Sequence, residues 1–246
     1  MTAENKPRVI VSLSIAMGIF LIAILLPKLL MTNTVLSLAT TQGLELTLTL
    51  LAIVIWGKGQ FSKYGFRKPE IRQGDKKCKT GWLLIFLTAP LLGIVTSITM
   101  LGLGGTGNLV IKQLSFPQIV LFVWISSSII EEVFTRGFLQ SHLSVLSGSY
   151  FKLPIFRIEL PILISAVFFS GMHLVLLLAD VDIITIVTTL LFTFSIGLMA
   201  GHYRKKTGSL IPAIAVHILA NIGGVIGGVI YTFVNFLITG KLPSIG

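Results

Sequence analysis

Long apolar runs recur along this 246-residue chain, and they restrict its fold more than any other feature of the sequence. The first run, from Val9 to Leu30, contains no charged residue before Lys28. At about 1.5 Å per residue, a helix of this length crosses roughly 30 Å of hydrocarbon. Hydrophobic residues make up 54% of the chain and charged residues 11%, a composition that excludes a soluble globular protein. The sequence therefore predicts an all-α, polytopic membrane helix bundle.

The apolar runs predict seven to eight transmembrane helices. The expected spans are 9–30, 35–56, 81–104, 117–139, 160–179, 183–203 and a divided stretch at 209–238. That last stretch would be about 45 Å long as one helix, which is too long for one straight span and too short for two. Its glycines indicate a break, and they are Gly223, Gly224, Gly227 and Gly228. We expect a short seventh helix that contains His217 and Asn221, followed by a partial eighth.

Basic residues are concentrated in the loops on one side of the predicted bundle. Residues 57–80 carry eight lysines and arginines against Glu70 and Asp75. The positive-inside rule predicts that this loop and the N-terminus are cytoplasmic in a multi-pass protein of the cell membrane. The net charge of +10 then reflects topology and contact with anionic membrane lipid. We expect no nucleic-acid partner.

Three ionisable residues stand together inside the fourth apolar run. Placing a charge at the centre of a membrane helix costs about 2.5 to 3.5 kcal/mol, so Glu131, Glu132 and Arg136 must be paired, functional or both. Glu132 and Arg136 are four residues apart, a spacing that permits an ion pair on one helix face. Glu131 is rotated by about 100° and has no partner on the same helix. One glutamate is expected to be structural and the other to be available for chemistry. Glu45 is a further acid, in the second run.

Two more polar clusters lie in later spans. His173 stands in the fifth, and His217 and Asn221 stand four apart in the seventh. Counted along their helices, these side chains and Glu131 lie about 12 to 20 Å from the cytoplasmic ends. Costly polar groups at a common depth predict one internal polar cavity. Such a set suits acid–base chemistry on water, with a carboxylate as base and imidazole or carboxamide donors for an oxyanion.

The three clusters resemble the motifs of a known family. They are Glu131-Glu132-x-x-x-Arg136, Phe169-x-x-x-His173 and His217-x-x-x-Asn221, each on its own span. This pattern is similar to that of the CAAX prenyl endopeptidases and bacteriocin-processing enzymes, the CPBP or Abi family. The resemblance covers about residues 82–224. It divides the chain into two N-terminal helices with a basic loop (1–80), a CPBP-type catalytic core (81–224) and a C-terminal partial helix and tail (225–246).

The resemblance implies an intramembrane endopeptidase, a CAAX-type hydrolase that acts on a peptide or membrane-protein substrate. It implies that Glu131 activates a water molecule and that His173 shares in the activation. His217 and Asn221 would stabilise the tetrahedral intermediate. The residues implied to support the site are Glu132, Arg136 and Phe169. The sequence does not predict an oligomeric state.

The family is often described as metalloproteases, and Glu131, His173 and His217 would be the metal ligands. Such a set can hold zinc and leave one position open for water. The sequence lacks the His-Glu-x-x-His arrangement that is typical of zinc proteases, and Cys78 is its only cysteine. A glutamate-activated water without a cofactor is therefore favoured, with zinc as the alternative.

Two other functions remain open. Intact motifs do not separate a protease from a catalytically silent membrane scaffold or a bacteriocin-immunity protein. A transporter or proton relay also uses intramembrane acids and histidines. We favour it less, because the two halves of the sequence show no repeat and the polar clusters occupy only later spans.

Overall fold

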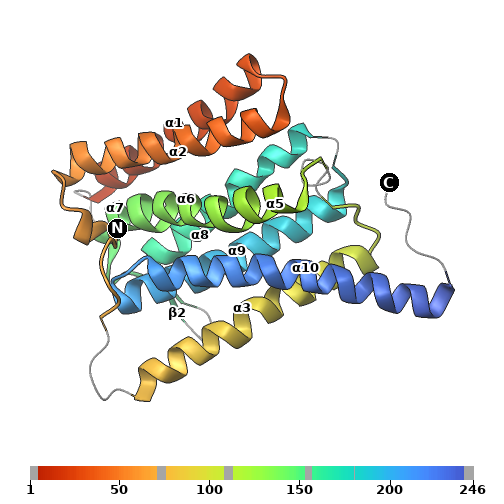
Figure 1. The fold of residues 1–246 in the computed structure, drawn as a ribbon. Coiled ribbons are helices and arrows are strands. Elements are labelled where there is room, and N and C mark those ends of the chain that lie inside the picture. The colour runs from red at the N-terminus through yellow and green to blue at the C-terminus, as the bar shows by residue number, and fades with distance from the viewer. Residues whose placement is uncertain (1–4, 71–75, 108–112, 153–156, 180, 241–246) are drawn as a thin grey trace.

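The computed structural model describes residues 5–70, 76–107, 113–152, 157–179 and 181–240 of the chain (Figure 1). Within these residues, seven helical segments are long and apolar enough to cross a membrane, and the prediction of an all-α, polytopic bundle is confirmed. The segments are Asn5–Leu30, Thr34–Gly57, Gly81–Gly102, Phe116–Leu146, Leu160–Leu178, Ile183–Thr207 and Ile211–Thr239. The end of the predicted tail (241–246) and the side chain of Cys78 lie outside the described residues.

Most spans are single α-helices, which satisfy their backbone hydrogen bonds internally, as hydrocarbon requires. These are α1 (Asn5–Leu30), α2 (Thr34–Gly57), α3 (Lys76–Gly102), α9 (Ile183–Thr207) and α10 (Ile211–Thr239). The fifth span changes from α8 (Leu160–Met172) to the 3-10 helix η5 (His173–Leu178). The 3-10 turn η1 (Phe61–Tyr64) follows α2, and an antiparallel hairpin of β1 (Tyr150–Lys152) and β2 (Arg157–Glu159) precedes α8.

The fourth span changes its winding several times. Its segments are α5 (Phe116–Gln118), η2 (Ile119–Ser126), α6 (Ser127–Glu132), η3 (Val133–Leu139), α7 (Gln140–His142) and the 3-10 turn η4 (Leu143–Leu146). Both η2 and η3 are π-helical. Wide π turns are rare and occur frequently at functional sites. The short α6 lies between them and ends in Glu131 and Glu132, so the two carboxylates stand where the winding changes.

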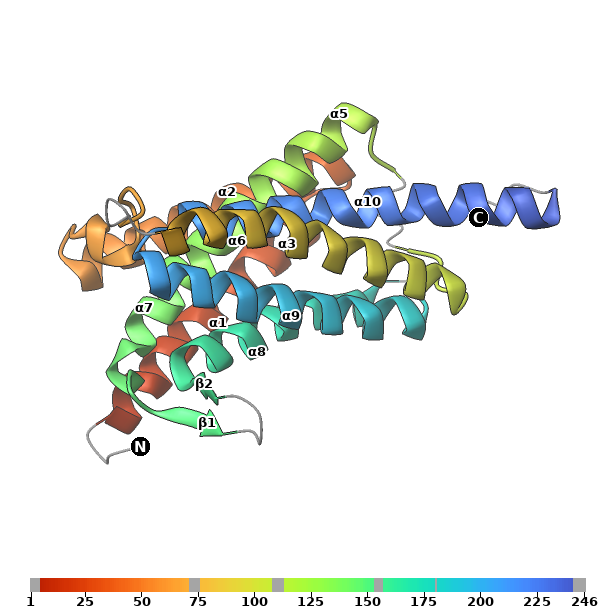
Figure 2. The same ribbon diagram turned by 90° about the horizontal axis from the view of Figure 1, so that it is seen from below.

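The helices cross the bundle back and forth. Figure 1 shows α1 and α2 along one edge, the fourth span in the middle, and α3 with α10 along the opposite edge. The end of α2, the turn η1, α7, the β-hairpin and the end of α9 all lie at one end of the bundle (Figures 1 and 2). We call this the basic end, because Lys58, Lys63, Arg204 and Lys205 lie there. Its predicted cytoplasmic orientation stays a prediction.

The predicted break at the glycines of the last span is wrong, because α10 is one continuous helix. Residues 225–239 therefore extend this helix and do not form a separate partial one. Gly223 and Gly227 serve close packing against α3, beside which α10 lies in both views (Figures 1 and 2). A Cβ atom on Gly223 would stand 2.1 Å from the carbonyl oxygen of Pro90, and one on Gly93 would stand 2.0 Å from that of Ala220. Small residues let membrane helices approach closely, which offsets the helix-breaking tendency of glycine, about 1 kcal/mol each.

Asp182 links two segments at the end of the bundle opposite the basic end. It caps α9 by accepting a hydrogen bond from the backbone N–H of Thr185 at 2.8 Å, and it also accepts one from the backbone N–H of Thr106 at 2.9 Å. Desolvation opposes ionisation of the carboxyl group, but the hydrogen bonds from Thr106 and Thr185 outweigh it and lower the pKa of Asp182. An ionised cap thus connects the loop after α3 to the start of α9.

Candidate active site

Two basic side chains, Arg136 and His217, contact the carboxylate of Glu132. Its Oε1 accepts a hydrogen bond from Arg136 Nη1 at 3.2 Å, and both side chains are 0% exposed. The helical spacing predicted this pair. The Nδ1 atom of His217 lies 3.1 Å from the same carboxylate oxygen. Because a carboxylate can only accept, Nδ1 carries the hydrogen and the tautomer of His217 is set by Glu132.

His217 therefore turns its other nitrogen toward the second glutamate. Its Nε2 lies 3.8 Å from Glu131 Oε2. The Glu131 carboxylate is anchored by Ser127, whose hydroxyl donates to Oε1 at 2.5 Å. The side chain of Glu131 is 19% exposed, whereas that of Glu132 is fully buried. One imidazole thus lies between a fully buried, paired carboxylate and a partly exposed one.

His173 stands where α8 changes to η5. Its Nδ1 lies 3.0 Å from the backbone carbonyl oxygen of Phe169. A carbonyl only accepts, so Nδ1 carries the hydrogen and Nε2 holds a lone pair when the ring is neutral. His173 lies within electrostatic range of Glu131 and His217. The structure thus brings together the residues of all three predicted clusters.

Phe169 lies at the centre of this arrangement. The guanidinium of Arg136 stands 4.5 Å from the centroid of its ring, a cation–π contact. The ring also meets the imidazoles of His173 and His217 edge to face, with centroids 5.2 Å and 5.5 Å apart. Phe169 is fully buried. Its ring therefore packs against side chains from three spans, which fits the supporting role predicted for it.

Asn221 is placed differently from the prediction. Its amide nitrogen donates to Ser128 Oγ at 3.2 Å and to the carbonyl oxygen of Val123 at 3.4 Å, so in this structure its hydrogens are directed at the fourth span. Asn221 also lines a cavity of about 330 Å³ between α3, the fourth span and α9. Arg136 lines a second cavity, of about 820 Å³, at the basic end. Each of these two cavities is thus lined by one motif residue, and Glu131, His173 and His217 line neither of them.

Sequence reasoning missed the two serines of α6. Ser127 and Ser128 stand four residues before Glu131 and before Glu132, so each faces the same side as one glutamate. This four-residue spacing could have identified both serines from the sequence. Ser127 anchors Glu131, and the fully buried Ser128 accepts from Asn221. The hydroxyl groups therefore orient the acidic motif from within its own helix.

Glu45 approaches the site from α2. It is 7% exposed, its Oε1 has no hydrogen-bond partner among the described residues, and it lies within electrostatic range of Glu131. The sequence identified it as an intramembrane acid but gave no position for it relative to the motifs. The helix α2 packs against α6, which carries Glu131.

Glu131, His173 and His217 are the side chains that would hold a metal ion. Within the described parts of the chain, no three or more His, Cys, Asp or Glu side chains converge closely enough to hold an ion. Glu131 and His217 lie 3.8 Å apart and His173 lies within electrostatic range of both, but the three do not form such a group. We derive no catalytic step through a metal.

The fold and the site together define a polytopic membrane protein with a carboxylate–imidazole cluster inside its helix bundle. Residues 113–223 match the family model described as Rce1-like, type II CAAX prenyl endopeptidase Rce1-like. The match begins just before α5, ends in α10 and includes every motif residue. It confirms the predicted resemblance to CAAX prenyl endopeptidases and supports CAAX-type intramembrane protease activity in general. No curated protein and no solved structure gives a significant match to the chain.

Proposed function

We propose that this protein is an intramembrane endopeptidase that hydrolyses a peptide bond of a membrane-associated protein or peptide with a water molecule activated by Glu131. The observation that carries the proposal is the position of Glu131. Its carboxylate is anchored by Ser127, partly exposed, and faces His217 Nε2 at 3.8 Å. A fixed carboxylate that water can reach, inside an apolar bundle, is suited to general base catalysis.

In this mechanism Glu131 takes a proton from water while the water oxygen attacks the carbonyl carbon. His173 accepts the second hydrogen bond of that water at Nε2, because its Nδ1 is occupied by the Phe169 carbonyl. When the tetrahedral intermediate collapses, the C–N bond breaks and Glu131 returns its proton to the departing amine. The carboxylate is then ready for another water molecule.

His217 stabilises the negative charge of the intermediate. In its protonated form it donates from Nδ1 to Glu132 and from Nε2 toward the region beside Glu131 where the oxyanion develops. Arg136 balances the charge of Glu132, so the imidazole is oriented by a neutralised pair. Asn221 adds a donor only after its amide leaves Ser128; otherwise it acts by positioning α6.

The multi-pass arrangement agrees with a substrate that reaches the site from the membrane. We place the protein in the cell membrane with the basic end and the N-terminus in the cytoplasm, following the positive-inside rule. Membrane lipid and a peptide substrate are its expected partners. No cofactor is required by the steps above.

The test is Glu131→Gln, which removes the base and retains the size of the side chain. We expect turnover of a farnesylated C-a-a-X tetrapeptide to fall by about 10² to 10⁴-fold, with normal folding in detergent. Asp182→Asn is a matched carboxylate-to-amide control at the far end of the bundle, where asparagine is also a good helix cap. Retention of more than about a tenth of wild-type turnover by Glu131→Gln would contradict general base catalysis by this residue. Comparing the membrane peptidomes of cells that carry each protein would reveal the natural substrate.

A further inference from the structure

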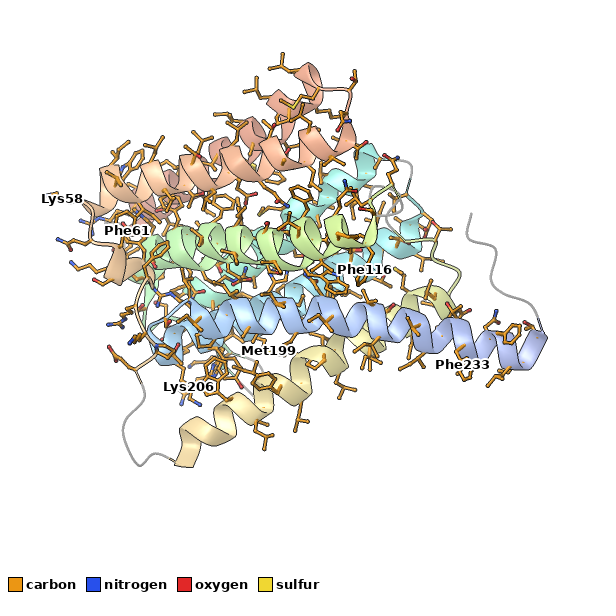
Figure 3. The ribbon with its side chains drawn as sticks, viewed as in Figure 1. Lys58, Phe61, Phe116, Met199, Lys206 and Phe233 are labelled. Atoms are coloured by element: carbon orange, nitrogen blue, oxygen red, sulfur yellow. The ribbon has the colours of Figure 1, made fainter. Side chains whose placement is uncertain are left out.

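A large polar cavity at the basic end has no role in the mechanism above. Its volume is about 820 Å³. Lys58 and Lys206 mark this end of the bundle in Figure 3, far from Phe233 near the end of α10. The basic residues that line the cavity are Lys58, Lys63, Arg67, Arg136, Arg204 and Lys205. Glu159 also lines it but is already paired with Lys205. The lining therefore carries an excess of positive charge.

Arg204 is the most unusual of these residues. Only 8% of it is exposed, and no described carboxylate lies within ion-pair distance of it. Its Nη2 donates to the carbonyl oxygen of Lys63 at 3.0 Å and to Ser141 Oγ at 3.4 Å, and its Nε has no partner among the described residues. Burying an unpaired charge is costly, and buried arginines are normally paired with an anion. Arg136, which is 0% exposed, is paired with Glu132.

A second guanidinium adds to the positive field. Arg67 lies within electrostatic range of Arg204, and its Nε is fixed by a 2.9 Å hydrogen bond to the carbonyl oxygen of Gly208. Its ion pair with Glu70 is at the surface, where both side chains are largely exposed. Solvent-exposed ion pairs are weak because water and salt screen the two charges. Arg67 and Arg204 therefore face the cavity with more positive charge than their protein partners neutralise.

We propose that this cavity is an anion site that binds the C-terminal carboxylate of the peptide substrate. The inference rests on the proposed endopeptidase function. Arginine presents its N–H groups in a fork that matches the two oxygens of a carboxylate. Arg204 thereby gains the counter-ion that it lacks, and substrates with a free C-terminus are selected.

The distance from the candidate active site fits a short C-terminal segment. Arg136 contacts Glu132 and also lines the cavity, so the two regions adjoin. Gln140 lines the cavity nine positions after Glu131. Most of this stretch is the π-helix η3, which rises less per residue than an α-helix, so the two residues lie at most about 13 Å apart along the helix axis. In a C-a-a-X terminus the carboxylate follows the cysteine by three residues, which span at most about 10 Å when extended. The two lengths therefore differ by no more than about 3 Å.

A lipid headgroup carries the same anionic chemistry, through phosphate. The lining favours the peptide, because its large apolar side chains are limited to Trp56, Tyr64 and Pro161 and offer little surface for acyl chains. The cavity also adjoins the catalytic carboxylates through Arg136, which binding of a lipid headgroup would not require. The experiment separates these two sources.

The test measures binding, so it does not depend on turnover. Full-length Glu131→Gln protein is placed in phosphatidylcholine nanodiscs and titrated with a farnesylated tetrapeptide, cysteine followed by two aliphatic residues and methionine, as the free acid and as the carboxamide. We expect the acid to bind at least about tenfold more tightly, because a guanidinium forms charge-assisted hydrogen bonds with a carboxylate that it cannot form with a neutral carboxamide. Adding Arg204→Gln should abolish the difference. Lys206→Gln, a neighbouring charge that does not line the cavity, should preserve it.

Lys63→Gln provides a second variant in case Arg204→Gln fails to fold, because the Lys63 side chain is exposed and only its backbone carbonyl binds Arg204. It should reduce the difference between acid and amide. Equal binding of the two peptides to Glu131→Gln would overturn the proposal. So would loss of the difference in nanodiscs that contain phosphatidylglycerol, which would assign the cavity to lipid. If wild type cleaves neither peptide but the difference in binding persists, the endopeptidase function fails and the anion site stands.

Discussion

Replacing Arg136 by methionine removes the charge that neutralises Glu132 while it retains most of the side-chain volume. Glu132 and Arg136 are both 0% exposed, so no water can compensate the stranded carboxylate. Breaking a buried ion pair from one side costs about 3 to 5 kcal/mol in soluble proteins. The cation–π contact between Arg136 and Phe169 is lost as well, which adds about 0.5 to 2 kcal/mol.

The loss can be measured by thermal unfolding in detergent. For a chain of 150 to 250 residues, 1 kcal/mol corresponds to roughly 2 to 4 °C in Tm. A cost of about 3 to 5 kcal/mol therefore lowers the Tm of Arg136→Met by about 6 to 20 °C. Adding Glu132→Gln removes the stranded charge and should recover part of the Tm, because losing both partners costs less than losing one. A Tm within about 2 °C of wild type for Arg136→Met, or a double variant less stable than both single variants, would refute the burial argument.

Three further outcomes are expected. If Asn221 acts by positioning α6 through Ser128, Ser128→Ala should lower kcat as much as Asn221→Ala does. A loss of about 10² to 10³-fold in Asn221→Ala alone would instead identify Asn221 as a direct oxyanion donor. Gly223→Leu should disrupt the contact between α10 and α3 and lower Tm, whereas Gly224→Leu should have little effect, because a Cβ atom there meets nothing within 4 Å; equal melting of the two would count against this contact. Extended treatment with EDTA or phenanthroline should leave turnover unchanged, and loss of activity that added zinc restores would replace the metal-free mechanism with a metal-bound one.

The sequence alone determined the spans and the local pairing inside them. A helix must be long and apolar to cross a bilayer, and this requirement is visible in composition and run length. The predicted spans therefore agree with the helices to within about four residues, except that the fourth continues to Leu146 and does not end at residue 139. Glu132 and Arg136 meet because residues four apart share a face of their own helix. The order of the three motifs likewise needed no structure, and the family match agrees with it.

Only the tertiary structure decided the contacts between spans. The position of His217 in the sequence does not predict that its two ring nitrogens face two different glutamates. That arrangement depends on the rotation of α10 relative to α6, which packing sets. Gly223 and Gly227, two of the glycines that predicted a break, lie in a close contact with α3, which the sequence of one helix does not reveal. Arg204 directly follows the predicted sixth span, where the sequence shows it only as one more basic residue at the end of a span. Its burial without a counter-ion depends on where η1 and the fourth span fold over the end of α9, and that contact is made between residues far apart in the chain.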